Sequence, residues 1–107
     1  MKRFGIVLTL AVALGAAAPA ATKDFTVTQK NKEFSDKEVR VAAGDSLVFQ
    51  NQDDVTHNVY SITKGLEFEL KTQAPGKSDT VKFDRAGTIL VECAIHPKMK
   101  LRVHVGG

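Results

Sequence analysis

The chain has 107 residues, of which 43% are hydrophobic and 25% charged, the composition of one ordinary globular domain. Its 15 basic and 12 acidic residues give a formal charge of +3 and form no long block of one sign, which excludes a disordered polyelectrolyte. The single cysteine, Cys93, excludes a secreted miniprotein that internal disulfides hold together.

The N-terminus has the three-part pattern of a secretory signal peptide. Residues 2–3 are basic, residues 4–14 are apolar except for one threonine, and small residues follow. We expect cleavage after Ala20 or Ala21. An uncleaved anchor is the alternative, but the apolar run is short for a bilayer-spanning helix of about 20 residues. The sequence therefore predicts a signal peptide over residues 1–21, a single domain over 22–107 and export to the bacterial periplasm, with membrane contact only through the leader.

The mature part is close to neutral. Without the leader it has 13 basic and 12 acidic residues, and Tyr60 is the only tyrosine. It therefore lacks the basic stripe and the stacking platform of nucleic-acid-binding proteins, and we exclude nucleic acid as a partner. An exported free cysteine is open to oxidation. We therefore expect Cys93 to be a metal ligand, buried or reactive, in a protein that we expect to be a monomer.

Short alternating runs rich in β-branched and aromatic residues predict strands throughout the mature chain. Gly, Asp, Asn and Pro separate these runs, as at Ala43-Gly44-Asp45 and Ala74-Pro75-Gly76. The expected strands are Asp24–Gln29, Glu38–Val41, Ser46–Asn51, Asn58–Ile62, Glu67–Leu70, Thr80–Asp84, Thr88–Cys93 and Lys100–Val105.

This pattern predicts an all-β fold. About eight short strands at this spacing fit a β-sandwich of two antiparallel sheets. No window of the mature part has a helical period, so helical bundles and nucleotide-binding α/β folds are excluded. Residues 63–79 are the least regular stretch and the best candidate for a mobile connection. A domain of this size has a thin core, which a metal crosslink would strengthen.

Three potential soft or borderline metal ligands lie within seven residues near the C-terminus: Cys93, His96 and Met99. A thiolate, an imidazole and a thioether suit copper, and a site for both copper oxidation states combines two His and one Cys with a long axial Met. His57 is the candidate for the second histidine, because it starts another predicted strand. Strand ends at one edge of a sandwich converge, so His57 can reach the later loop.

Each ligand taken alone has an ordinary structural explanation. Cys93 and Met99 could fill the core, His57 could cap a turn, and His96 could be a loop residue. Their joint occurrence in an exported β-protein favours a metal site. His104 is excluded from that site, because the alternation along the last strand turns it outward.

The motif His-Asn-Val at 57–59 followed by Cys-x-x-His-Pro-x-Met at 93–99 resembles the cupredoxins, the small type 1 blue-copper proteins. The two residues between His96 and Met99 are more similar to amicyanin and the related methylamine-utilisation cupredoxins than to plastocyanin, whose ligand loop is longer. The resemblance covers nearly the whole mature chain and implies a cupredoxin-like Greek-key β-sandwich. It also implies His57, Cys93 and His96 as strong copper ligands and Met99 as the weak axial ligand.

The resemblance implies one-electron transfer between redox proteins, with one copper ion and no enzymatic turnover. Asn58 matches the family asparagine that ties the ligand loops together and hydrogen-bonds near the cysteine sulfur. In the family the second histidine, here His96, passes electrons through a small apolar surface. The matching surface residues are Ala94, Ile95, Pro97 and, at the rim, Lys98, which favours an acidic partner. A c-type cytochrome or a periplasmic dehydrogenase is the expected kind of partner.

Glu92 departs from the family pattern, because many relatives have an aromatic residue before the cysteine. This puts an electron route through that side chain in doubt. The sequence also lacks the clustered acidic patch of plant plastocyanins.

Three other functions remain as alternatives. The same soft ligands would serve a periplasmic carrier that delivers or sequesters copper. An enzyme could use Cys93 as a nucleophile with His57 or His96 as the base, but the sequence shows no oxyanion hole or substrate cleft. Zinc would prefer another Cys or His to a thioether.

Overall fold

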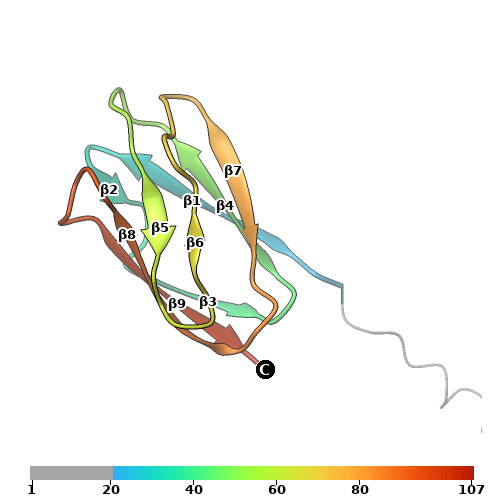
Figure 1. The fold of residues 1–107 in the computed structure, drawn as a ribbon. Helices are drawn as coiled ribbons and strands as arrows, with labels where there is room; N and C mark the ends of the chain where they lie inside the picture. The colour runs from blue at the N-terminus through green and yellow to red at the C-terminus, as the bar shows by residue number, and fades with distance from the viewer. Residues whose placement is uncertain (1–20) are drawn as a thin grey trace, which may run out of the picture.

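A computed structural model describes residues 21–107 (Figure 1). The predicted signal peptide, residues 1–21, lies outside this part except for its last residue. The described elements are all strands: β1 Asp24–Lys30, β2 Glu33–Phe34, β3 Glu38–Ala42, β4 Ser46–Asn51, β5 Val59–Ser61, β6 Phe68–Glu69, β7 Ser78–Lys82, β8 Gly87–Cys93 and β9 Lys100–Gly106. Over residues 21–107 there is no helix with the length and hydropathy to cross a membrane.

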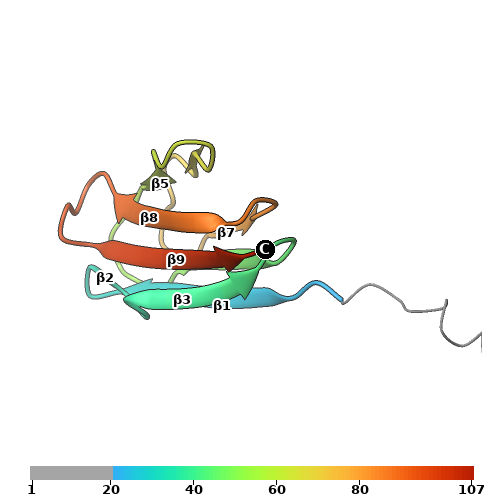
Figure 2. The ribbon, with the colours of Figure 1, turned by 90° about the horizontal axis from the view of Figure 1, so that it is seen from below.

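The strands form two sheets, as the all-β prediction required. One sheet has the order β2-β1-β4-β7 and the other the order β3-β9-β8-β5-β6. Figure 2 shows β8, β9 and β3 running alongside one another. The expectation of purely antiparallel sheets is wrong, because β1 pairs with β4 and β3 pairs with β9 in parallel. Both parallel pairs join strands that are not consecutive along the chain, so the Greek-key crossovers bring them side by side.

The strand predictions are accurate to within a few residues, and the structure adds one strand, β2. This two-residue strand forms a hairpin with the end of β1, in the register Gln29↔Phe34 and Lys30↔Glu33. Residues 63–79 are not a featureless connection. They contain β6, and Gln73 within them is fully buried and forms a bridge to His57.

Alternating inward residues of both sheets build the core. Leu101, Val103 and Val105 of β9 are buried while Arg102 between them is exposed, as the period of two predicts. Burying such an aliphatic side chain stabilises the fold by about 1.5–3 kcal/mol. Phe49 packs against Phe68 with ring centroids 5.9 Å apart, which joins the two sheets through aromatic contact.

The fold brings three separate segments to one end of the sandwich. The β1–β2 hairpin turn, the loop between β4 and β5, and the loop between β8 and β9 all lie at this end (Figure 1). Cys93 is the last residue of β8 and lies opposite Val59 of β5. This register places the segment before β5, which contains His57, beside the loop that follows Cys93.

Candidate metal centre

His57 is held in place by its backbone. It lies outside the named strands, but its N–H donates to the Gln73 carbonyl over 3.0 Å and its carbonyl accepts from the Gln73 N–H over 2.8 Å. The side chain is 0% exposed. Two backbone hydrogen bonds therefore fix the position from which the buried imidazole extends.

Cys93 lies where β8 meets its loop, and it is only 1% exposed. The backbone N–H of Asn58 donates to the Cys93 Sγ over 3.4 Å, and the N–H of Ala94 donates to the Asn58 carbonyl over 2.9 Å. These two contacts tie the loop of the first histidine to the loop of the cysteine. Both use the backbone of Asn58, whose buried side-chain oxygen has no partner among the described residues.

His96 belongs to a tight turn that brings the chain back toward β9. The N–H of Met99 donates to the His96 carbonyl over 2.9 Å, and Pro97 follows His96 directly. Proline fixes its own φ near the value that the second position of such a turn requires. Met99 is 2% exposed, whereas His96 is only partly buried. The turn thus returns the methionine to the core and leaves the histidine at the surface.

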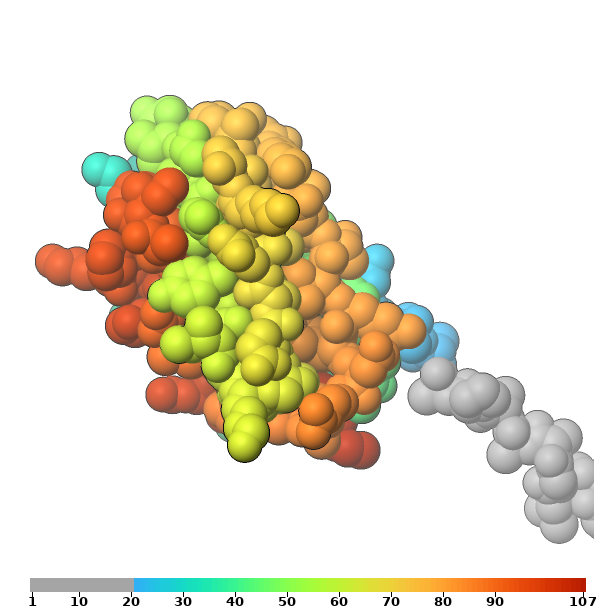
Figure 3. Space-filling view, viewed as in Figure 1, coloured from blue at the N-terminus to red at the C-terminus, as the bar shows by residue number. Residues whose placement is uncertain are grey.

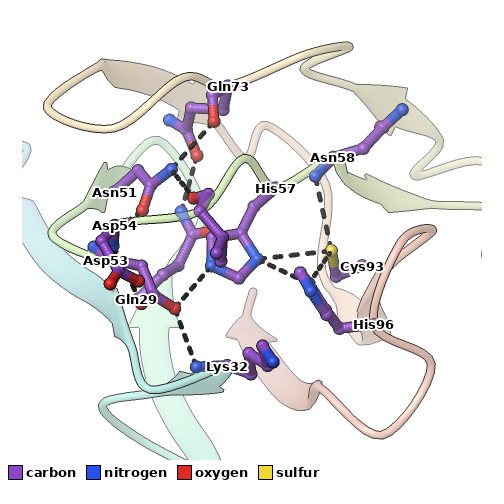
Figure 4. A network of polar contacts seen from close by, with 11 residues as sticks. Gln29, Lys32, Asn51, Asp53, Asp54, His57, Asn58, Gln73, Cys93 and His96 are labelled. Carbon is purple, nitrogen blue, oxygen red and sulfur yellow. Dashed lines mark hydrogen bonds and ion pairs between the residues drawn. The ribbon is translucent and has the colours of Figure 1, made fainter.

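The three side chains converge on one point (Figure 4). Cys93 Sγ lies 3.6 Å from His57 Nδ1 and 3.8 Å from His96 Nδ1, and the two Nδ1 atoms are 3.1 Å apart. The centre of such a triangle lies about 2 Å from each corner, which matches metal–nitrogen and metal–sulfur bonds of about 2.0–2.3 Å. The structure therefore brings together three of the four predicted ligands with room for one ion.

The chemistry of these donors fits copper. Two imidazoles and one thiolate in a trigonal set, with a methionine nearby as a weak fourth ligand, define type 1 copper sites. Among residues 21–107, the His, Cys, Asp and Glu side chains that lie close enough to share an ion here are His57, Cys93 and His96. This cluster offers three strong ligands, whereas a structural zinc site has four.

Asp53 orients the first histidine, a role that the sequence reading missed. Its Oδ2 lies 2.9 Å from His57 Nε2 and also accepts the backbone N–H of Lys32 over 2.8 Å. A proton on Nε2 leaves the Nδ1 lone pair free for a metal. The hydrogen bond from the Lys32 N–H, followed by the bond to His57, holds the pKa of Asp53 well below its usual range despite its burial. Asp53 is therefore an anion that fixes the ring of His57.

A buried polar network supports the same side of the site. Gln73 Nε2 donates to the Phe49 carbonyl, its Oε1 accepts from Gln29 Nε2 over 2.6 Å, and Asn51 Nδ2 donates to the Gln73 carbonyl. Gln29, Asn51 and Gln73 are all 0% exposed. The alternation of β1 and β4 could have shown that Gln29 and Asn51 point inward, but no local signal marks Gln73.

The second histidine lies in different surroundings. Its ring packs edge-on against His57, with centroids 4.8 Å apart at 60°. Burial, followed by the neighbouring His57 and Lys32, lowers the pKa of His96, which favours the neutral ring that a metal requires. The four residues expected to surround it, Ala94, Ile95, Pro97 and Lys98, are all exposed.

Two further predictions concern residues outside the cluster. His104 lies on β9 away from the site, 3.3 Å from a carboxylate oxygen of Glu38. Glu92, the departure from the family pattern, is partly buried and accepts hydrogen bonds from the Tyr60 hydroxyl over 2.8 Å and from Lys100 Nζ over 3.1 Å.

Comparison with known families agrees with the fold and the donor set. The family model described as "Cupredoxin-like domain" matches residues 3–105. This chain belongs to the cupredoxin family. The family resemblance that the ligand motif indicated is thereby confirmed.

Two curated relatives place this cupredoxin in the amicyanin and MauL group. The methylamine utilization protein MauL of Methylorubrum extorquens is 34% identical over 102 residues, which cover 94% of this chain and 90% of that protein. Amicyanin-alpha of the same organism is 31% identical over 106 residues, which cover 91% of this chain and 87% of that protein.

Solved structures share the fold at lower identity. A purple cupredoxin from Nitrosopumilus maritimus has a TM-score of 0.69 at 20% identity, covering 78% of this chain and 100% of that one. A reduced amicyanin mutant has a TM-score of 0.71 at 23% identity, covering 80% and 85%. The copper-containing nitrite reductase of Thermus scotoductus has a TM-score of 0.74 at 21% identity over 86% of this chain, which corresponds to 24% of that enzyme.

Proposed function

We propose that this protein is a periplasmic type 1 blue-copper electron carrier, with His57, Cys93 and His96 as strong ligands and Met99 as the weak axial ligand. The observation that carries this proposal is the triangle of donor atoms, with sides of 3.1, 3.6 and 3.8 Å. The predicted signal peptide supports export to the periplasm.

The residues around the triangle hold one arrangement of donors. Copper, when bound, supplies a one-electron couple between Cu(I) and Cu(II). Asp53 keeps the ring of His57 in one tautomer, and the Asn58 N–H stabilises negative charge on the Cys93 sulfur. Burial of His57 and Cys93 excludes water from that side. Donors that cannot move far keep the rearrangement between the two oxidation states small.

Electrons leave and enter through His96 in this proposal, because His96 is the strong ligand that reaches the surface. The exposed side chains of Ala94, Ile95 and Pro97 surround it with apolar area, and Lys98 adds a positive charge. A small patch suits short encounters with another redox protein. The family resemblance makes a c-type cytochrome or a periplasmic dehydrogenase the partner to test first, and the name of one relative, a methylamine utilization protein, points to methylamine metabolism.

The test is to load the purified protein with Cu(II) and to record its visible spectrum and a voltammogram, with Cys93→Ala as the control. We expect an intense blue thiolate-to-copper band that bleaches on reduction, returns on oxidation and is absent from the control. A protein that forms no such band but binds and readily exchanges Cu(I) would instead be a copper carrier. The buried His57 and Cys93 argue against ready exchange.

The axial role of Met99 has its own test. Met99→Leu removes the thioether but keeps an apolar side chain of similar size at a buried position. We expect a blue copper protein with a higher reduction potential, because a weak axial donor stabilises Cu(II). An unchanged potential would remove Met99 from the ligand set.

A further inference from the structure

The turn of the β1–β2 hairpin carries a lysine in an unusual backbone conformation. Asn31 and Lys32 link the paired residues Lys30 and Glu33, with φ values of 53° and 58°. A two-residue turn with both φ values positive favours Asn followed by Gly. Asn31 fits this rule, whereas Lys32 occupies the position at which glycine is least strained. A side chain kept there at a conformational cost points to a role at the surface.

The hairpin turn is attached to the end of the sandwich that holds the three donor atoms. The backbone N–H of Lys32 and the Nε2 of His57 share one oxygen, Asp53 Oδ2, at 2.8 and 2.9 Å (Figure 4). One carboxylate thus fixes the turn relative to the first histidine. The exposed part of Lys32 therefore occupies a defined place beside the site.

Lys32 lies on the same surface as the second histidine. One shallow hollow is lined by Lys32, Ile95, His96, Pro97 and Lys98. In the space-filling view, the red-orange 94–99 loop projects from the molecule near the cyan turn (Figure 3). Two chain segments, more than 60 positions apart in the sequence, therefore border the exposed edge of His96.

The charged side chains that line the hollow at His96 are all positive. Two lysines and no carboxylate line its hollow. Among residues 21–107, neither Lys32 nor Lys98 forms an ion pair, whereas Lys100 pairs with Glu92 over 3.1 Å. Lys98 also lines two further hollows. One of them is mixed in charge, because Glu33 and Asp36 line it together with lysines. The other contains Lys37, Lys98, Lys100 and Arg102 and no carboxylate. The positive area thus continues from Lys98 toward Arg102, whereas Glu33 and Asp36 bound it on the side of the hairpin.

We propose that the turn of the β1–β2 hairpin is the second half of the docking surface around His96, and that Lys32 and Lys98 together select a redox protein that presents carboxylates. This inference rests on the proposed electron-transfer function, since it assigns the partner of the same site. Lys32 and Lys98 line the same hollow as the apolar side chains of Ile95 and Pro97, so a matching partner carries an apolar spot beside acidic groups.

A protein partner fits this surface better than a membrane or a nucleic acid. Opposite charges steer the encounter and fix the orientation of two proteins, while the small apolar centre keeps the complex short-lived. Ile95, with 51% of its surface exposed, provides that centre. The mature chain carries only one excess positive charge, so its overall attraction to phosphate-rich surfaces is weak.

The experiment uses a hexaglutamate peptide as the carboxylate probe in an NMR titration of the reduced, copper-treated protein at low ionic strength. We expect the amide shifts to cluster at Lys32, Ile95 and Lys98 and to disappear at high salt. Lys32→Gly removes the charge and suits the backbone of the turn, so it keeps the fold. It should weaken peptide binding about twofold to fivefold, and Lys98→Glu should weaken it more.

Lys64→Glu is the matched control for Lys98→Glu, because Lys64 is an exposed lysine in the loop at the opposite end of the sandwich (Figure 1). Shifts that scatter over other lysines, or binding that Lys32→Gly leaves unchanged, would overturn the proposal. Binding of the native protein to phosphatidylglycerol vesicles that Lys32→Gly abolishes would also overturn it, since the surface would then recognise lipid.

The set of amide shifts that the peptide causes does not depend on electron transfer. A blue, reversibly cycling protein with scattered shifts would therefore refute this inference alone. Amide shifts that cluster around His96 in a protein without a blue band would refute the proposed function, and with it the redox nature of the partner.

Discussion

The two histidines of the metal centre are held in different ways. His57 is fully buried, its backbone is bridged to Gln73, and its Nε2 contacts Asp53. His96 is partly exposed, and its ring contacts are to His57 and Cys93 of the site itself. The first half of the site is built into the core, whereas the second half is a short loop at the surface.

This difference separates two tasks that one metal site must perform. A redox site needs donors that stay in place when the charge of the ion changes, and the buried half provides them. It also needs a contact with the partner, which only an exposed ligand offers. The comparison predicts that changes in the buried half alter metal binding and stability, while changes in the exposed half alter access.

The sharpest way to break this comparison is to remove each imidazole in turn. His57→Gly and His96→Gly should both lose the blue band, because each removes one of three strong donors. Added imidazole should restore the band in His96→Gly, since the vacated volume opens to solvent beside Pro97. It should not restore the band in His57→Gly, whose position is 0% exposed. Visible spectra with and without imidazole measure this difference.

Circular dichroism must show the native sheet content in both glycine variants, because only folded variants allow the recovery of the blue band to be compared. Equal recovery in the two variants would show that the buried half opens as easily as the surface loop. The proposed division of tasks would then be wrong.

The next largest effect should come from Asp53. Asp53→Ala removes the acceptor of both His57 Nε2 and the Lys32 N–H. We expect copper affinity to fall about 10- to 100-fold, as for other outer partners of metal-bound histidines. Asp53→Asn retains a side-chain oxygen and should lose less. The exposed neighbour Asp54 gives the control Asp54→Ala, and competition with a copper chelator measures all three affinities. Equal affinities for Asp53→Ala and Asp54→Ala would contradict this role.

Much of this fold was predictable from local sequence. Alternation located eight of the nine strands, because each has one face in the core and one toward solvent, as along β9 from Leu101 to Val105. The parallel pairing of β1 with β4 was not predictable, because periodicity within a strand does not identify its neighbour. The strand β2 is too short to show a period.

Some residues of the candidate site could likewise be predicted from the sequence and others could not. Cys93, His96 and Met99 lie close together in the sequence, and their chemistry made them visible. Asp53 and Gln73 were missed because their roles depend on contacts across loops, with His57 Nε2 and with the Phe49 carbonyl. Lys32 was missed because the hairpin turn reaches the site only in the folded sheet.

A smaller effect should come from the buried amide of Gln73. Gln73→Leu leaves the Phe49 carbonyl and the Gln29 amide without their partner in the interior. We expect the free energy of unfolding to fall by about 1–3 kcal/mol, measured by urea denaturation. Gln52→Leu is the control at an exposed glutamine and should change stability by less than about 0.5 kcal/mol. A Gln73→Leu protein as stable as the control would show that the amide network does not anchor the buried half.

The smallest effect should come from Pro97, in the exposed half. The side chains of residues 94–98 are exposed or partly buried. The hydrogen bond from the Ala94 N–H to the Asn58 carbonyl holds the start of this loop, and the turn closed by the Met99 N–H and the His96 carbonyl holds the rest. Pro97→Ala keeps both hydrogen bonds but gives the unfolded chain more freedom, which should lower stability by about 0.4–1 kcal/mol. Copper affinity should change less than in Asp53→Ala, because Asp53 still fixes the ring of His57. Urea denaturation and the chelator competition test both statements on one sample. If Pro97→Ala lost as much copper affinity as Asp53→Ala, the surface loop would hold the ion as firmly as the core, and the two halves would not differ in the way their burial indicates.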